Sequence, residues 1–242
     1  MRKVALVCVA AFVGALGITA VASAIQGTQT VSMSLLSNRA GTKAKPRSVS
    51  RLTVQTNTTV VPGEPPFAAT RAVLHFDKNL VFGNSKFATC AKNVVQTNPA
   101  SCPAGSKIGS GSAQAQTSVG IKTTAAITAY NGPRTASGNG KLFLLVREPT
   151  FNVNAVLDGT LKPDTGKYGR KLDVAIPKNI QNIAGVVVTL TQFTTRVGGT
   201  AKGTPYVGLK ACSGGKLNVK GDFTYTDGTS KSAVNTANCR AS

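Results

Sequence analysis

Few side chains in this sequence of 242 residues could take part in acid–base chemistry. His75 is the only histidine, and Asp and Glu together number eight. Apolar and polar residues alternate over 72–77, which predicts a strand with His75 and Asp77 on the face opposite Leu74 and Phe76. Asp77 as the orienting carboxylate of a His75 base would give a hydrolase. We favour the simpler interpretation, two polar residues on the solvent face of an amphipathic strand.

The acidic residues do not form a recognisable catalytic pair. Most lie near glycine or before proline, in contexts typical of turns and strand ends: Asp158, Asp164, Asp227, Glu64 and Glu148. No two of the remaining Asp77, Asp173 and Asp222 can be placed together from sequence, as a glycoside hydrolase would need. The sequence therefore predicts no catalytic residue, no metal site and no cofactor.

The cysteines indicate two disulfides. Cys8 lies in the apolar N-terminal segment, which leaves Cys90, Cys102, Cys212 and Cys239. An even number in an exported chain is typical of disulfides, and four cysteines allow three pairings. The pairing of nearest neighbours closes the shortest loops, and in the loop-entropy model its two bridges contribute roughly 3 and roughly 3.5 kcal/mol. A zinc site is the less favoured alternative, because the spacings are not Cys-x-x-Cys.

The N-terminus predicts export. Residues 1–3 are Met-Arg-Lys, residues 4–21 are almost entirely apolar, and residues 22–24 are Ala-Ser-Ala. This pattern is typical of a secretory signal peptide over 1–24, with an uncleaved membrane anchor as the alternative. We expect a protein secreted to the cell exterior or retained in the cell envelope.

The charge is strongly positive. The formal net charge of +20 becomes +18 without Arg2 and Lys3. Such an excess favours polyanions, and we expect anionic wall or membrane polymers as partners. Nucleic acid is not expected, because the chain is exported and carries no recognised motif. The candidate polyanion-binding residues are Lys43, Lys45, Arg47, Lys167, Tyr168, Arg170 and Lys171.

Two questions about this surface stay open. Tyr168 lies among basic residues and is the best candidate for an exposed ring that stacks on an acidic glycan. The basic residues are also scattered along the chain, so a solvated surface without a dedicated partner is an equal alternative. The sequence does not predict the oligomeric state.

Alternating apolar and polar residues recur along the whole chain and predict an all-β fold. We expect ten to twelve strands in an antiparallel β-sandwich, with a short disulfide-closed loop over 86–106 that includes one or two helical turns. The run 142–146 is a central strand, and 156–161 turns at Asp158-Gly159. Asp227-Gly228 joins the last two strands in a hairpin.

The expected domain organisation follows from these elements. Residues 25–47 form an N-terminal strand and a basic turn, and residues 48–242 form one sandwich domain. A division into two smaller sandwiches near 132–140 is the alternative.

Four blocks of sequence carry a resemblance. They are Gly41-Thr-Lys-Ala-Lys-Pro46, Phe87-Ala-Thr-Cys90, Cys102-Pro-Ala-Gly-Ser-Lys-Ile-Gly-Ser-Gly111, and Phe223-Thr-Tyr-Thr-Asp-Gly228 between Cys212 and Cys239. In this order they resemble a family of uncharacterised, secreted, β-rich proteins of actinobacteria. Lys216-Leu217 departs from the pattern, since an aromatic residue such as Trp is expected there. The resemblance implies location and fold and brings no activity.

These observations favour a secreted, non-catalytic protein of the cell envelope that associates electrostatically with anionic polymers. A glycan- or protein-binding adhesion module is the first alternative, and an extracellular hydrolase built on His75 and Asp77 is the second.

Overall fold

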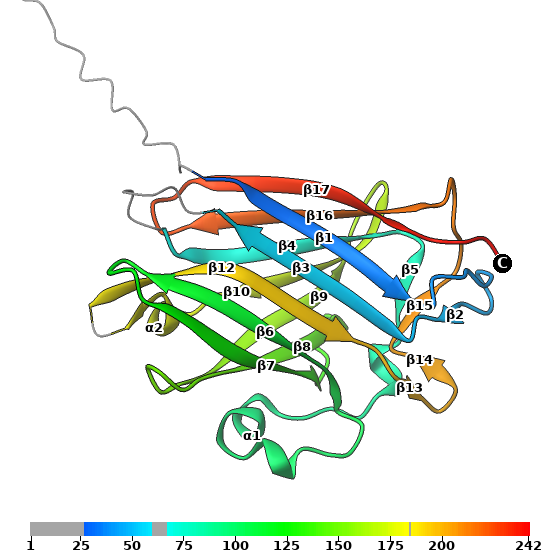
Figure 1. Cartoon of the computed structure of the whole chain (residues 1–242). Helices are drawn as coiled ribbons and strands as arrows, with labels where there is room; N and C mark the ends of the chain where they lie inside the picture. Colours follow the sequence, from blue (N-terminus) through cyan, green and yellow to red (C-terminus); the bar gives the residue numbers. More distant parts are fainter. Residues whose placement is uncertain (1–26, 60–66, 184) are drawn as a thin grey trace, which may run out of the picture.

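The computed structural model describes residues 27–59, 67–183 and 185–242, and these residues form an all-β fold (Figure 1). The predicted signal peptide over 1–24 lies outside them. Eleven strands follow one another in one antiparallel sheet, and β11 (Asn182–Ile183) pairs only with β12. In spatial order they are β1 (Gln29–Leu36), β3 (Arg51–Thr58), β12 (Val186–Val197), β6 (Lys107–Thr117), β7 (Lys122–Gly132), β8 (Gly140–Glu148), β9 (Val153–Pro163), β10 (Tyr168–Ala175), β4 (Ala69–Asp77), β16 (Lys216–Tyr225) and β17 (Ser230–Asn238).

The sheet curls until its two edge strands, β1 and β17, lie side by side (Figure 1). The Asn235 side-chain amide on β17 donates to the Val31 carbonyl on β1 at 3.1 Å. Beyond the ends of these strands, the backbones of Arg39 and Arg240 form an isolated parallel β-bridge. Two halves of one sheet thereby face each other, and their apolar faces form one core. The prediction of an all-β antiparallel sandwich is confirmed.

Alternation decides which side chains enter the core. In β16, Leu217, Val219, Phe223 and Tyr225 are buried on one face. β8 is buried on both faces from Leu142 to Val146, because helix α1 (Lys92–Thr97) covers its outer side. This explains why the strand reads as an uninterrupted apolar run.

Both predicted disulfides are present, Cys90–Cys102 and Cys212–Cys239. The first closes the short loop that contains α1 and the one-turn helix η2 (Pro99–Ser101), and the one-turn helix η1 (Asn84–Lys86) precedes this loop. The second ties the start of the C-terminal hairpin to its end. The hairpin turn at Asp227-Gly228 is also confirmed, with Gly228 at φ +83°.

The predicted turn at Asp158-Gly159 is wrong. Both residues lie inside β9, where Gly159 is paired with Leu142 on β8 and Val174 on β10. A side chain at Gly159 would put its Cβ about 3.0 Å from Leu172 and 3.1 Å from the Leu142 carbonyl. Here glycine allows close approach of neighbours in a sheet, a use that sequence alone does not separate from a turn.

The two ends of the sandwich are closed differently. Where β4 ends, three short strands form a small sheet: β2 (Arg47–Ser48), β15 (Val207–Leu209) and β5 (Leu80–Phe82). The hairpin of β13 (Thr200–Ala201) and β14 (Thr204–Pro205) lies at this end, and both disulfides join segments that connect strands there. Where β4 begins, the described connections include the turns between β6 and β7, β8 and β9, and β16 and β17, together with helix α2 (Lys178–Gln181). The stretch 132–140 joins β7 to β8, which pair along their length.

Candidate functional site

Segments far apart in the sequence meet at the end of the sandwich where β4 ends. The Gly41 amide donates to the Leu209 carbonyl at 2.9 Å, and the Lys210 amide donates to the Asn79 carbonyl at 3.0 Å. The Lys78 amide donates to the Lys167 carbonyl at 3.0 Å. These backbone bonds hold the 41–46 loop, β15, the β4–β5 corner and the β9–β10 turn against one another.

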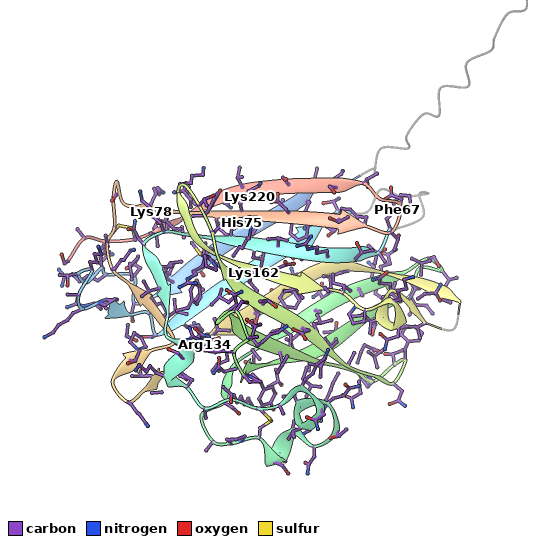
Figure 2. The ribbon with its side chains drawn as sticks, turned by 180° about the vertical axis from the view of Figure 1, so that it is seen from behind. Phe67, His75, Lys78, Arg134, Lys162 and Lys220 are labelled. Atoms are coloured by element: carbon purple, nitrogen blue, oxygen red, sulfur yellow. A yellow bond between two sulfur atoms is a disulfide. The ribbon has the colours of Figure 1, made fainter. Side chains whose placement is uncertain are left out.

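These segments and the residues that adjoin them carry eight cationic side chains, which we call the basic end: Arg39, Lys43, Lys45, Arg47, Lys78, Lys167, Lys210 and Arg240. Lys210 is partly exposed and the other seven are exposed. Among the described residues, no carboxylate lies within ion-pair distance of any of the eight. Lys78 and Phe67, labelled in Figure 2, mark opposite ends of the molecule.

The carboxylate at the end of β4, expected on the solvent face, is buried and forms no ion pair with these cations. Asp77 is buried, and its Oδ1 accepts a hydrogen bond from the Asn79 amide at 2.9 Å. Its Oδ2 accepts from the backbone and side-chain amides of Asn218 at 2.8 and 2.9 Å. Asp77 therefore fixes the β4–β5 corner to β16 and makes no hydrogen bond to His75, which the hydrolase hypothesis requires.

An open hollow of about 510 Å³ lies at the basic end. Its walls come from residues 44–46, 81–83 and 203–205, so it runs between the basic loop and the β13–β14 hairpin. Lys45 lines it directly, and exposed Lys202 lies next to its wall in the hairpin turn. The lining mixes charged, polar and apolar atoms, as an extended polar chain would need.

The sequence-predicted binding residues divide into two groups. Lys43, Lys45, Arg47 and Lys167 come together at the basic end. The other three, Tyr168, Arg170 and Lys171, lie on β10.

Two of the residues on β10, Tyr168 and Lys171, are less available than expected, whereas Arg170 is exposed. The Tyr168 ring is partly buried, with its centroid 5.5 Å from that of His75, and the Lys167 ammonium lies 5.4 Å from the Tyr168 centroid. Lys171 Nζ lies 3.9 Å from Asp164 Oδ1. Tyr168 thus packs against the protein and is not a free platform.

Four members of the basic end were not found from sequence: Arg39, Lys78, Lys210 and Arg240. No spacing signals them, because their proximity depends on strand order. Arg240 follows Cys239 and lies beside Arg39 only because the sheet curls.

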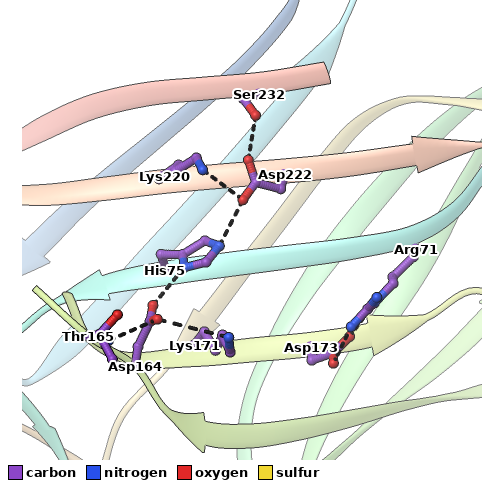
Figure 3. Close-up of polar contacts among 9 residues, drawn as sticks. All are labelled: Arg71, His75, Asp164, Thr165, Lys171, Asp173, Lys220, Asp222 and Ser232. Carbon is purple, nitrogen blue, oxygen red and sulfur yellow. Dashed lines mark hydrogen bonds and ion pairs between the residues drawn. The ribbon is translucent and has the colours of Figure 1, made fainter. Parts of the chain in front are cut away.

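The outer face of β10, β4 and β16 carries a polar network centred on His75 (Figure 3). His75 Nδ1 lies 2.6 Å from Asp164 Oδ2, and Nε2 lies 2.9 Å from Asp222 Oδ2. Asp222 also accepts a hydrogen bond from Ser232 at 2.5 Å and pairs with Lys220 at 2.9 Å. A protonated imidazole donates to both carboxylates, whereas a neutral ring donates to only one.

Burial and charge act in opposite directions on these carboxyl groups. Burial alone would raise the pKa of Asp164, but hydrogen bonds from His75 and Thr165 lower it overall. Burial would likewise raise the pKa of Asp222, but hydrogen bonds from Ser232 and Lys220 lower it overall. Both groups are therefore held as carboxylates, which suits ion pairing.

The network lacks the contact that activates a nucleophile. Ser232 donates to Asp222, and His75 contacts the same carboxylate, so the ring does not accept a proton from the hydroxyl. A Ser–His–Asp triad needs the histidine between the hydroxyl and the carboxylate. The arrangement links β4, β16 and β17 to one another and to the β9–β10 turn across the outer face of the sheet.

A second outer-face cluster joins β9, β10 and β4. Arg71 donates two hydrogen bonds to Asp173, both 2.7 Å long, and Lys162 donates a third at 2.8 Å. The bonds from Arg71 lower the pKa of Asp173 to about 2, against an opposing effect of burial. Such a bidentate pair fixes the register of the two strands as well as their charge.

Metal binding and membrane insertion are two further possibilities for the described part of the chain. It holds no cluster of three or more His, Cys, Asp or Glu residues that could bind a metal ion. In the same residues, no helix has the length and apolarity to cross a membrane.

Comparison with known proteins gives a distant structural likeness. No family model and no curated protein matches the chain. One solved structure is similar, the T6 backbone pilin of serotype M6 Streptococcus pyogenes, which is described as a modular three-domain structure with variable loops and extensions. The sequence identity is 10%, the TM-score is 0.31, and the match covers 88% of this chain and 36% of the pilin. The chain thus spans about a third of the length of that protein.

Proposed function

We propose that this is a non-catalytic protein of the cell exterior that binds anionic wall or membrane polymers through its basic end. One observation carries the proposal: backbone hydrogen bonds gather eight cations on one end without a carboxylate among the described residues to pair with them. The two disulfides support an oxidising location outside the cytoplasm.

The binding mechanism is distributed electrostatics. Exposed cations on a rigid frame create a positive potential that concentrates a polyanion at one end of the molecule. Each contact is weak in water, and a polymer gains affinity by making several at once. The hollow beside Lys45 gives such a chain a path across the end. Because exposed charges are screened over about 8 Å at physiological ionic strength, binding must weaken as salt rises.

The test uses linear polyphosphate as the probe and compares two charge reversals of equal size. The first variant carries Lys43→Glu, Lys45→Glu and Arg47→Glu. The control carries Lys122→Glu, Arg147→Glu and Lys178→Glu, which reverse three exposed cations far from the basic end. We expect the first variant to lose about tenfold or more in affinity at low salt, and the control to lose no more than about threefold.

Two outcomes would overturn the proposal. Equal losses in the two variants would mean that net charge alone governs binding. Affinity that stays constant between about 50 and about 200 mM salt would mean that the contacts are not mainly ionic. That second result would favour a specific glycan- or protein-binding module that uses the same hollow.

A further inference from the structure

The interior of the sandwich is incompletely filled at the end where β4 begins. Along β12 the inward side chains Thr195 and Val197 are buried, whereas Val188, Leu190 and Phe193 are only partly buried. A cavity of about 110 Å³ lies beside these three residues, and we call this end the cavity end. This cavity lies at the end of the sandwich opposite the basic end, and its lining differs from that of the hollow there.

Small side chains create the space. Ala113 and Ala115 on β6, Ala125 on β7 and Ala69 on β4 face the cavity, at positions where Leu or Val would fill it. The rest of the wall consists mainly of Val, Leu, Ile and Phe side chains. A second cavity, of about 70 Å³, shares five of the same lining residues and extends across the interior to Phe223 and Tyr225 on β16. The two cavities adjoin along these shared, mainly apolar residues, and the second also has Thr56, Thr58 and Thr195 in its wall.

The few polar groups in the wall of the first cavity are already bonded to the protein. Glu148 accepts hydrogen bonds from the Thr150 and Phe151 amides at 2.8 and 2.7 Å, and also from the Thr123 hydroxyl. The Gln181 amide donates to the Ile176 carbonyl at 2.5 Å. A water molecule needs two to four polar partners to occupy such a space, so this one favours an apolar occupant.

Within the described residues the cover over the cavity is slight, and the surface beside it is apolar. Ile180 and Gln181 of α2 line the space, and this helix has only four residues. The turn between β6 and β7 presents Val119 and Ile121, which are 65% and 46% exposed. The Ser118 amide donates to the Val187 carbonyl at 2.8 Å, which fixes this turn to the start of β12.

We propose that the cavity end binds the alkyl chain of an amphiphile. An apolar cavity of about 150 Å³ takes up a benzene-sized molecule. Two adjoining cavities of about 110 and about 70 Å³ suit part of a flexible alkyl chain better than a single ring. The alkyl chain occupies the space between the two halves of the sheet, and the polar head group of the amphiphile stays in solvent beside the β6–β7 turn. This site shares no residue with the basic end, so it stands or falls separately from the proposed function.

The test is binding of dodecanoate to the full protein, at concentrations below micelle formation, by calorimetry. We expect one molecule per chain. Ala125→Leu fills the cavity and should weaken binding by about tenfold or more, because the chain and the new side chain need the same volume. Ala126→Leu is the matched control, since Ala126 is exposed on the other face of β7 and its variant should bind normally.

A second filling variant, Ala113→Val on β6, guards against misfolding of the first, and a circular dichroism spectrum reports the fold of both. Absence of dodecanoate binding to the wild-type protein would overturn the proposal. So would unchanged affinity in a folded filling variant, or uptake of benzene without uptake of dodecanoate.

A second experiment determines whether the amphiphile comes from a membrane or from solution. Uptake from phosphatidylglycerol vesicles that slows with Val119→Ser and Ile121→Ser, while binding of dispersed dodecanoate is unchanged, identifies membrane lipid as the source. Uptake that is indifferent to these changes identifies dispersed amphiphile. Both results support chain binding.

Discussion

The basic end and the cavity end belong to the same sheet but are built in opposite ways. At the basic end several connections are long, carry short strands of their own and are tied by the two disulfides. At the cavity end three of the described connections are four-residue turns, and small side chains leave the interior open. The cations of the basic end repel one another, and both disulfides lie at this end, where they can hold the connecting segments in place. Neither disulfide lies at the cavity end, and the interior there is less completely filled.

Truncation of one leucine at each end measures this difference most strongly. Leu217 is fully buried in β16, whereas Leu190 lines both cavities. We expect Leu217→Ala to lower the free energy of unfolding by about 4 kcal/mol and Leu190→Ala by about 2 kcal/mol, because part of the cavity already exists at Leu190. Urea denaturation provides both values, and equal losses would contradict an unfilled cavity end.

Removal of a disulfide tests the rigidity of the basic end. Cys212→Ser with Cys239→Ser should cost about 3.5 kcal/mol, and Cys90→Ser with Cys102→Ser about 3 kcal/mol, because the bridges restrict the unfolded chain. Polyphosphate affinity should fall in the first variant as the loops around the cations loosen. Dodecanoate affinity should be unchanged. A loss at the cavity end alone would reverse the comparison.

Acid should weaken the outer face between the two ends. The pKa of Asp173 is lowered to about 2, so its ion pairs stabilise the fold above the ordinary carboxyl pKa of about 4 and lose that effect as pH falls toward 2. Asp173→Asn should therefore destabilise the protein at neutral pH and matter progressively less below pH about 4. Thermal melts across this range provide the check, and a difference that does not vary with pH would contradict it.

The fold was largely predictable because its signals are local. Alternation placed the strands, the Asp227-Gly228 turn placed the last hairpin, and short loops favoured the correct disulfide pairing. The turn assigned to Asp158-Gly159 failed because glycine serves close packing there, which only the neighbouring strands reveal.

The sites were only partly predictable because they depend on strand order. Lys43, Lys45, Arg47 and Lys167 were found as locally basic segments, but their union with Lys78 requires β10 to pair with β4. The same topology gives His75 its partners Asp164 and Asp222, which lie 89 and 147 residues away. The cavity depends on alanines from three strands, and no local pattern announces a void.

Lysine footprinting tests the account most directly. The protein is acetylated with and without linear polyphosphate at low salt, and the modified residues are identified by mass spectrometry. Binding at the basic end predicts protection of Lys43, Lys45, Lys78 and Lys167, while Lys122 and Lys178 at the cavity end react equally in both samples. Uniform protection of both groups, or protection confined to the cavity end, would contradict it.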